Sequence, residues 1–156
     1  MPLDLALYQP DIARNTGTLL RLGACLGVTV HIIHPTGFPF SRRELKRGGL
    51  DYLDLADFIE HDSYAHFDAA RRGQGRRLVL LTTKASLSAY SADYADNDIL
   101  MVGRESAGVP DAVAHDAECR VRIPMRDGLR SINVAVAAAL VLGEAMRQTH
   151  AFARLT

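Results

Sequence analysis

The chain has 156 residues, and its 18 Lys and Arg balance 18 Asp and Glu, so the formal net charge is zero. This length favours one domain, residues 1–156, which can bury enough apolar surface to fold without disulfides. With 48% hydrophobic and 23% charged residues, the composition excludes disordered and collagen-like chains.

The sequence shows no sign of export or membrane insertion. The longest apolar stretch, 134–143, is about half of the roughly 20 residues that a membrane-spanning helix needs. The first residues contain no basic region that leads into an apolar one, as a secretory signal would. The two cysteines, Cys25 and Cys119, form no CxxC pair and are predicted to be reduced thiols. We therefore expect a cytoplasmic protein.

Charge is unevenly distributed along the chain. Residues 1–50 carry six basic and three acidic side chains, 51–70 carry six acids and no base, and 71–77 contain four arginines. A uniform attraction to nucleic acid is therefore excluded, whereas a local basic patch is allowed. The best candidate for such a patch is a group of four side chains: Arg42, Arg43, Lys46 and Arg47. The alternative interpretation of this group is a solvated helix face.

Three elements are predicted at the start of the chain. Residues 3–8 alternate at first between apolar and polar, which is typical of a half-buried strand. Asn15 or Thr16 can cap a helix that ends at Gly27. Residues 28–33 form a continuous run rich in β-branched side chains, which indicates a strand buried on both faces.

The elements predicted next are short. Ser41 can cap a basic helix that ends at the Gly48-Gly49 pair. Residues 53–59 are predicted as a strand. Asp62 is the candidate cap of a helix over residues 64–70.

The second half of the chain contains two buried strands, 78–81 and 99–102, and a short strand at 121–123. From Ser131 to about Thr149 the sequence is Ala-rich and helical. The alternation of strands and helices predicts an α/β fold with a mostly parallel sheet flanked by helices. A ligand of such a sheet binds beyond the carboxyl ends of the strands, so the loops at those ends are the candidate site.

Several known site motifs are absent from these loops. Residues 103–108 have the glycine spacing of a phosphate-binding Walker loop, but Val109-Pro110 follows where Lys and Ser or Thr are required. The position of Ser106 does not fit a nucleophile elbow. No GxGxxG follows the first strand, so the dinucleotide-binding motif is missing. The six histidines lack partners at ligand spacing, so we expect no metal site.

Three segments at predicted strand ends carry residues suited to chemistry. The first is Asn15-Thr16-Gly17 with Arg21, which on its own also fits a helix cap and an exposed arginine. The second, 102–110, either places a carboxylate between glycines that allow close backbone approach or forms a plain strand-to-helix turn. The third, 123–133, leads an apolar loop into a helix whose first turn presents a hydroxyl and an amide. In the simpler interpretation, Ser131 only caps that helix.

In this order and spacing, the three segments resemble the SPOUT RNA ribose 2′-O-methyltransferases, and the resemblance covers nearly the whole chain. The chain is most similar to the small tRNA wobble-nucleotide (cytidine or uridine 34) enzymes of that family, which have no separate RNA-binding domain. Further stretches match them: 7–10, 31–38, 46–52 and 81–84. Arg104 and Ala107 depart from the family, which often has an uncharged residue and Arg or Gly at these positions.

The resemblance implies an α/β fold whose C-terminal part is a deep trefoil knot that binds S-adenosylmethionine. It places four residues around this cofactor: Leu81, Gly103, Ile123 and Ser131. The implied reaction transfers the methyl group of the cofactor to a ribose 2′-hydroxyl, leaves S-adenosylhomocysteine and requires no metal.

The resemblance also places Arg21 near the reacting hydroxyl, with Asn15, Glu105, Ser131 and Asn133 around it. A guanidinium has a pKa above about 12 and no acceptor lone pair, so it is poorly suited to act as a base. We therefore expect Arg21 to hold the adjoining phosphate and stabilise developing oxyanion charge, while the proton passes to phosphate or water. Glu105 and Asn133 are expected to order Arg21 and the ribose, and Asn15 to fix their loop.

As partners, the resemblance implies a second copy of the chain and the anticodon loop of tRNA, with no membrane or DNA partner. The apolar faces of 18–26 and 134–146 fit either the surface of this homodimer or an ordinary core. Phosphate contacts are expected from five basic side chains: Arg42, Arg43, Lys46, Arg47 and Lys84.

Two alternatives stay open at this point. One is a related enzyme that methylates another tRNA or rRNA site, although such enzymes usually add an N-terminal RNA domain. The other is an inactive nucleotide- or RNA-binding module of the same fold, which would have no need of the cluster around Arg21.

Overall fold

A computed structural model describes residues 1–47 and 53–155. Within these ranges, strands and helices alternate along the chain as predicted, except that the strands at 78–81 and 99–102 follow one another with no helix between them. The strands are β1 (Asp4–Tyr8), β2 (Thr29–Ile33), β3 (Phe58–His61), β4 (Leu78–Leu81), β5 (Ile99–Val102) and β6 (Cys119–Val121). The helices are α1 (Ala13–Leu26), α2 (Arg42–Arg47), α3 (Tyr64–Gly73), α4 (Asp111–Asp116) and α5 (Val134–Gln148), with 3₁₀ turns η1 (Leu53–Leu55) and η2 (Ala151–Arg154).

The strands form one parallel sheet in the order β3-β2-β1-β5-β4-β6, which confirms the predicted α/β class. β1 lies inside the sheet between β2 and β5, and all of its residues are buried. The prediction of a half-buried first strand was therefore wrong. Its polar residue, Asp4, is buried because it pairs with Arg76 at 2.5 Å and is hydrogen bonded to His31 at 2.8 Å.

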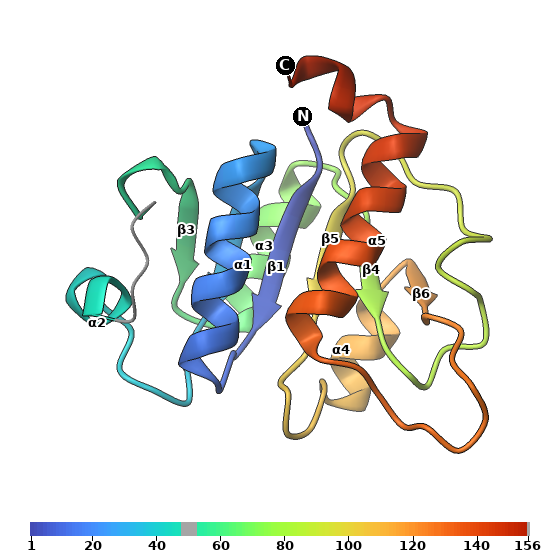
Figure 1. The fold of residues 1–156 in the computed structure, drawn as a ribbon, viewed down its shortest axis with the longest axis horizontal. Helices are drawn as coiled ribbons and strands as arrows, with labels where there is room; N and C mark the ends of the chain where they lie inside the picture. The colour runs from blue at the N-terminus through green and yellow to red at the C-terminus, as the bar shows by residue number, and fades with distance from the viewer. Residues whose placement is uncertain (48–52, 156) are drawn as a thin grey trace.

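Helices cover both faces of this sheet (Figure 1). α1 and α5 pack on one face, where Leu5 and Leu142 belong to the core, and α3 and α4 pack on the other, around Phe67 and Met101. Strands buried on both faces have continuous apolar sequences, which is why they could be predicted. The carboxyl ends of the parallel strands point toward the lower edge in Figure 1, and the loops that follow them gather there.

α1 begins earlier than predicted. Its first residue is Ala13 and Ile12 precedes it, so Asn15 and Thr16 lie within the helix and do not cap it. The Thr16 hydroxyl instead donates to the Ile12 carbonyl at 3.3 Å. Gly27 ends the helix as predicted, with a φ of 67° that favours glycine.

Two other helix caps also differ from the prediction. Ser63, not Asp62, caps α3, since its hydroxyl accepts the third amide of that helix at 3.2 Å. Asn133, not Ser131, caps α5. In both cases the true cap lies one or two residues later, where its side chain reaches the first free amide groups of the helix.

The remaining differences concern short elements. The strand predicted at 121–123 overlaps β6 (Cys119–Val121) only at Val121. The strand predicted at 53–59 was wrong in part, because η1 comes first and β3 begins only at Phe58. The predicted end of α2 at Gly48-Gly49 lies outside the described residues. α4 was not predicted, since six residues after Pro110 are too few to show a helical period. In the part of the chain that the structure describes, no helix is long and apolar enough to cross a membrane.

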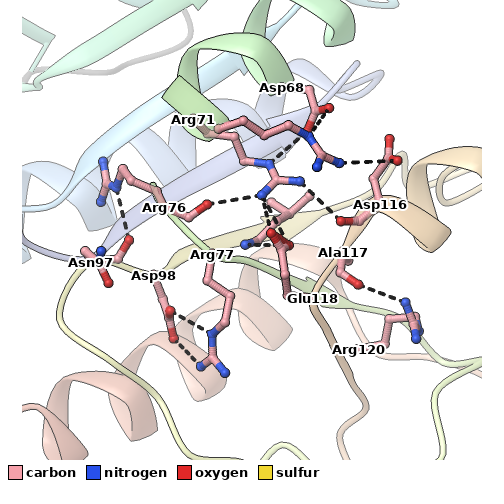
Figure 2. A network of polar contacts seen from close by, with 12 residues as sticks. Asp68, Arg71, Arg76, Arg77, Asn97, Asp98, Asp116, Ala117, Glu118 and Arg120 are labelled. Atoms are coloured by element: carbon pink, nitrogen blue, oxygen red, sulfur yellow. Dashed lines mark hydrogen bonds and ion pairs between the residues drawn. The ribbon is translucent and has the colours of Figure 1, made fainter. Parts of the chain in front are cut away.

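A network of charged side chains connects α3 to the amino ends of the strands (Figure 2). Arg71 of α3 lies in this network and is only 1% exposed. Its guanidinium pairs with Asp68 at 2.8 Å and Glu118 at 2.7 Å, and donates to the Arg76 carbonyl at 3.1 Å. Burial is the largest single influence on Glu118 and raises its pKa, but the hydrogen bond and charge of Arg71 together with main-chain hydrogen bonds outweigh it, so the pKa is lowered. The buried guanidinium depends on these partners, because an unpaired buried charge is costly.

We expect Arg71→Ala to lower the free energy of unfolding by about 3–5 kcal/mol, because it breaks a buried ion-pair network. Urea unfolding followed by circular dichroism measures this change. Arg72→Ala is the matched control, since Arg72 pairs with the same Asp68 at 2.8 Å from a position where 52% of its side chain is exposed. We expect a much smaller loss for this control. Equal losses in the two variants would contradict the importance assigned to burial.

Candidate active site

A pocket of about 870 Å³ opens at the carboxyl edge of the sheet. This volume is typical of sites for small molecules and cofactors. Its walls come from the segments that follow β4, β5 and β6 and from the starts of α1 and α5. With the exception of Arg21, the residues predicted around the cofactor and the reacting hydroxyl line it, as does Lys84: Asn15, Leu81, Gly103, Glu105, Ile123, Ser131 and Asn133.

The loop 103–108 folds back on itself beside the pocket. Arg104 donates its amide to the Gly108 carbonyl at 3.1 Å and accepts the Gly108 amide at 2.9 Å. A Cβ on Gly103 would lie 2.7 Å from the Gly108 carbonyl carbon, and Gly108 has a φ of 62°. Both positions therefore require glycine, and the pocket is bounded here by backbone.

Two more loops complete the walls. Thr82, directly after β4, donates its amide to the Val121 carbonyl at 2.9 Å, which joins the carboxyl ends of β4 and β6. The half-buried side chains of Leu81 and Ile123 supply apolar surface, and Ser131 is exposed. The walls thus combine apolar side chains with main-chain polar groups. Such a lining suits a cofactor that has a flat apolar part and a polar part.

A chain of hydrogen bonds joins three of the predicted residues at the polar side of the pocket. Asn15 donates from Nδ2 to Oε1 of Glu105 at 3.2 Å. Its Oδ1 accepts from Nδ2 of Asn133 at 3.1 Å. The Oδ1 of Asn133 accepts the second and third amides of α5, those of Ala135 and Val136, at 2.8 and 3.2 Å. Because the donor and acceptor ends of both amides are engaged, the orientation of each side chain is fixed.

Asp11 belongs to the same unit, although the sequence analysis did not single it out. Its Oδ1 accepts the amide of Glu105 at 3.1 Å, and its Oδ2 accepts the Ser106 hydroxyl. A hydrogen bond with the Glu105 carboxyl lowers the pKa of Asp11 to about 2. Burial, and then the neighbouring Asp11, raise the pKa of Glu105. In the sequence, an Asp after Pro10 reads as an ordinary turn residue, so no local signal identified it.

Arg21 and the basic helix lie outside the pocket lining. Arg21 is exposed on α1, six residues beyond Asn15 and therefore about 9 Å further along the helix axis. Arg42, Arg43 and Lys46 are exposed on α2, which lies beyond the β3 edge of the sheet (Figure 1). The side chain of Arg47 is outside the described part of the structure.

Positive charge predominates at the pocket. Two acidic side chains face four basic ones along its lining: Glu105, Asp111, Lys84, Arg104, Arg120 and Arg130. The Arg104 guanidinium lies over the ring of Tyr8, 5.5 Å from its centroid. Among the residues that the structure places, no group of three or more His, Cys, Asp or Glu side chains could hold a metal ion. The basic side chains can therefore bind an anionic group such as a phosphate, and the hydrogen-bonded amides can orient a hydroxyl group.

The solved structures that are similar to this chain include the following two. The first, described as giving structural insights into the 2-OH methylation of C/U34 on tRNA, has a TM-score of 0.87 and 40% identity, and the match covers 94% of this chain and 95% of that one. The second is an AdoMet-bound rRNA methyltransferase from Sinorhizobium meliloti, with a TM-score of 0.84 and 26% identity over 94% of this chain and 56% of that one.

Sequence comparison leads to the same group of proteins. The tRNA (cytidine(34)-2′-O)-methyltransferase of Ancylobacter novellus is 51% identical over 154 residues, which is 99% of this chain and 98% of the relative. The family model of the SpoU rRNA Methylase family matches residues 2–143. The chain therefore belongs to the SpoU rRNA Methylase family.

Proposed function

We propose that the protein is an S-adenosylmethionine-dependent methyltransferase that acts on the ribose 2′-hydroxyl of the wobble nucleotide, cytidine or uridine 34, of tRNA. The observation that carries this proposal is the hydrogen-bonded unit of Asn15, Glu105 and Asn133 at the edge of a pocket bounded by glycine backbone. The Ancylobacter relative and the C/U34 structure support the substrate, since each matches this chain over nearly its full length.

The pocket fits S-adenosylmethionine in size and in the kind of groups that line it. Leu81 and Ile123 would contact the adenine ring, and main-chain amides and carbonyls of the same loops would bind its polar edge. Gly103 leaves bare backbone at a place where a side chain would collide with Gly108. Ser131 is assigned to the cofactor as well. When bound there, the cofactor supplies an electrophilic methyl group, and the AdoMet-bound relative supports this assignment.

The residues of this chain would orient the ribose and stabilise charge. Methyl transfer to an oxygen is an in-line displacement, so the 2′-oxygen has to be held in one direction. Glu105 and Asn133 are assigned to the ribose, and Asn15 locks both by its hydrogen bonds. We assign Arg21 to the adjoining phosphate, where its guanidinium stabilises the negative charge that develops on the oxygen while the hydroxyl proton passes to phosphate or water.

We also assign the trefoil knot of the resembling family to the C-terminal part of this chain. The loop 82–98 is bonded to two segments that follow it. Ala89 donates its amide to the Arg122 carbonyl, beyond β6, at 2.7 Å. Gln148 at the end of α5 accepts the amide of Tyr94 and donates to the carbonyl of Ala92, both at 3.0 Å. The loop 82–98 is thus hydrogen bonded both to the segment after β6 and to the end of α5, and these contacts support our assignment of a knot to this region.

We further propose that two chains form one surface for cytoplasmic tRNA. α5 packs on α1 with one face and exposes Val136 and Leu140 on the other, and Ile132 is exposed just before the helix begins. Val136 and Leu140 are 52% and 43% exposed and lie one helical turn apart, so they form an apolar strip of the kind found at protein interfaces. Within one chain, α2 and Lys84 lie on separate parts of the surface, and a dimer would add a second set of these phosphate contacts.

The proposed activity can be tested on an anticodon stem-loop of tRNA. The purified protein should transfer a labelled methyl group to it, and nuclease digestion with mass spectrometry should place the label on the ribose of nucleotide 34. The matched control is the same stem-loop with 2′-deoxyribose at position 34, which lacks the acceptor oxygen and should gain no label. Label elsewhere in tRNA, or in rRNA only, would contradict the wobble assignment. No S-adenosylmethionine binding by calorimetry would favour the inactive module.

Asn133→Asp tests the hydrogen-bonded unit without removing the helix cap. The variant keeps an oxygen that caps α5 but loses the donor to Asn15. We expect an unchanged thermal midpoint and a kcat about 10–100-fold lower, because the reacting groups lose their fixed geometry. Asn133→Ala also loses the cap, which should lower stability by about 1 kcal/mol. Thermal melts and turnover measure the two effects, and a wild-type kcat in Asn133→Asp would refute the role of this unit.

Leu140→Glu tests the proposed dimer, because it places a charge in the exposed apolar strip of α5. We expect the wild-type chain to sediment as a dimer and this variant as a folded monomer, since Leu140 is already 43% exposed. Leu55→Glu is the control, at a leucine of η1 that is 74% exposed and lies far along the chain from α5. It should sediment like the wild type. A Leu140→Glu variant that remains dimeric would exclude this strip as the interface.

A further inference from the structure

Asp11 lies between the loop 34–40, which leads to the proposed RNA-binding helix α2, and the loop 103–108, which carries Glu105 at the pocket. We propose that Asp11 is a positioning residue, which holds Glu105 and Ser106 at the pocket and connects them to the loop that leads to α2. This role rests on the proposed function, because it acts on residues assigned to the ribose. Asp11 itself is not expected to touch the substrate.

The first observation is a reciprocal contact between Asp11 and Glu105, which are 94 positions apart. The Asp11 carboxylate accepts the main-chain amide of Glu105 at 3.1 Å. In return, the main-chain amide of Asp11 makes a longer contact, 3.4 Å, to Oε2 of Glu105. The Ser106 hydroxyl donates to the second oxygen of Asp11. Each carboxylate thus binds the backbone of the other residue, so the two loops are held in register.

The second observation is the tight packing of the 34–40 loop against Asp11. Gly37 donates its amide to the Pro10 carbonyl at 3.0 Å. A Cβ on Gly37 would lie 2.8 Å from the Cβ of Asp11 and 3.0 Å from its Cα, so any side chain there would displace the turn. This loop continues through Ser41 into α2, whose basic side chains are assigned to tRNA phosphates. Asp11 therefore connects the loop of the RNA-binding helix to the pocket.

The third observation is the chemistry of the paired carboxyl groups. Asp11 keeps a low pKa, so at neutral pH it is an ionised acceptor for the Glu105 amide and the Ser106 hydroxyl. The pKa of Glu105 is raised by burial first and by Asp11 second, while its other contacts are backbone amides and the neutral Asn15. Asp11 is therefore the one titratable group among the described causes of this shift. Replacing its carboxylate removes that cause.

These contacts predict which step depends on Asp11. When an amide replaces this carboxylate, one of the two acceptor oxygens for the Glu105 loop becomes a donor, and Asn15 loses a fixed partner for its amide. The backbone contacts between Arg104 and Gly108, and the walls at Leu81 and Ile123, do not involve Asp11. Cofactor binding should therefore survive, while the orientation of the ribose should not.

The experiment compares three substitutions in the full-length protein. Asp11→Asn keeps the shape of the side chain, and we expect a kcat about 10-fold lower, since misplaced catalytic groups act poorly. We expect the KM for tRNA and the calorimetric affinity for S-adenosylmethionine to stay within about threefold of the wild type. Asp11→Glu restores a carboxylate and should recover much of the lost kcat. Asp96→Asn, at an exposed aspartate outside the pocket lining, is the matched control and should behave like the wild type.

The pH profile of kcat separates positioning from a general loss of structure. In Asp11→Asn, Glu105 should ionise at lower pH, because the neighbouring carboxylate is gone, and the acid limb of the profile should move to lower pH. Gly37→Ala pushes on Asp11 but leaves both carboxyl groups in place. It should lower kcat without moving the acid limb.

Two results would overturn the role of Asp11: a wild-type kcat in Asp11→Asn, or a lowered kcat with an unmoved acid limb and no recovery in Asp11→Glu. If Asp11→Asn does not fold, the kcat of Gly37→Ala decides in its place, and a wild-type value would overturn the role. Wild-type protein that methylates no tRNA would overturn the proposed function itself, and this inference with it. Failure of the role of Asp11 and failure of the proposed function are thus distinguishable, because only the second abolishes tRNA methylation by the wild-type protein.

Discussion

Because the six strands run parallel, the segments that leave β1, β4, β5 and β6 meet at one edge of the sheet, where regular strand pairing has ended. Buried main-chain groups at such an edge need other partners. Asn133 supplies them for two amides of the first turn of α5, and Asp11 supplies one for the amide of Glu105. Asn15 then joins these two points. The polar groups of the candidate site are thus also the groups that stabilise its loops.

Much of the fold could be predicted because its strands are buried on both faces. The runs at 28–33, 78–81 and 99–102 are continuous and apolar, and the structure places strands at each of them. Helix starts were harder, because neighbouring residues offer equivalent caps. Asp62 and Ser63 both carry a suitable oxygen, and the path of the backbone decides which one meets the free amides. That path depends on tertiary contacts, which a local pattern does not contain.

In the candidate site, too, residues with a local sequence signal could be predicted and residues that depend on tertiary contacts could not. Gly103 could be singled out because close backbone approach demands glycine, and the structure shows that approach to Gly108. Asn15, Glu105 and Asn133 were singled out because their spacing resembles that of a known family. Asp11 was missed, since its importance comes from a residue 94 positions away and its local context is that of a turn. Long-range partners of this kind are visible only once the chain is folded.

The positions of the basic residues separate the proposed cofactor binding from the proposed RNA binding. All four residues assigned to the cofactor line one pocket, whereas Arg21 and the exposed residues of α2 lie outside its lining. The backbone and apolar parts of the pocket walls select by shape, while charges spread over the surface select a polyanion with little regard to shape. Affinity for RNA can therefore depend on residues that make no contact with the cofactor. The turn at Asp11 lies where these two sets of residues meet, between the loop before α2 and the loop of Glu105.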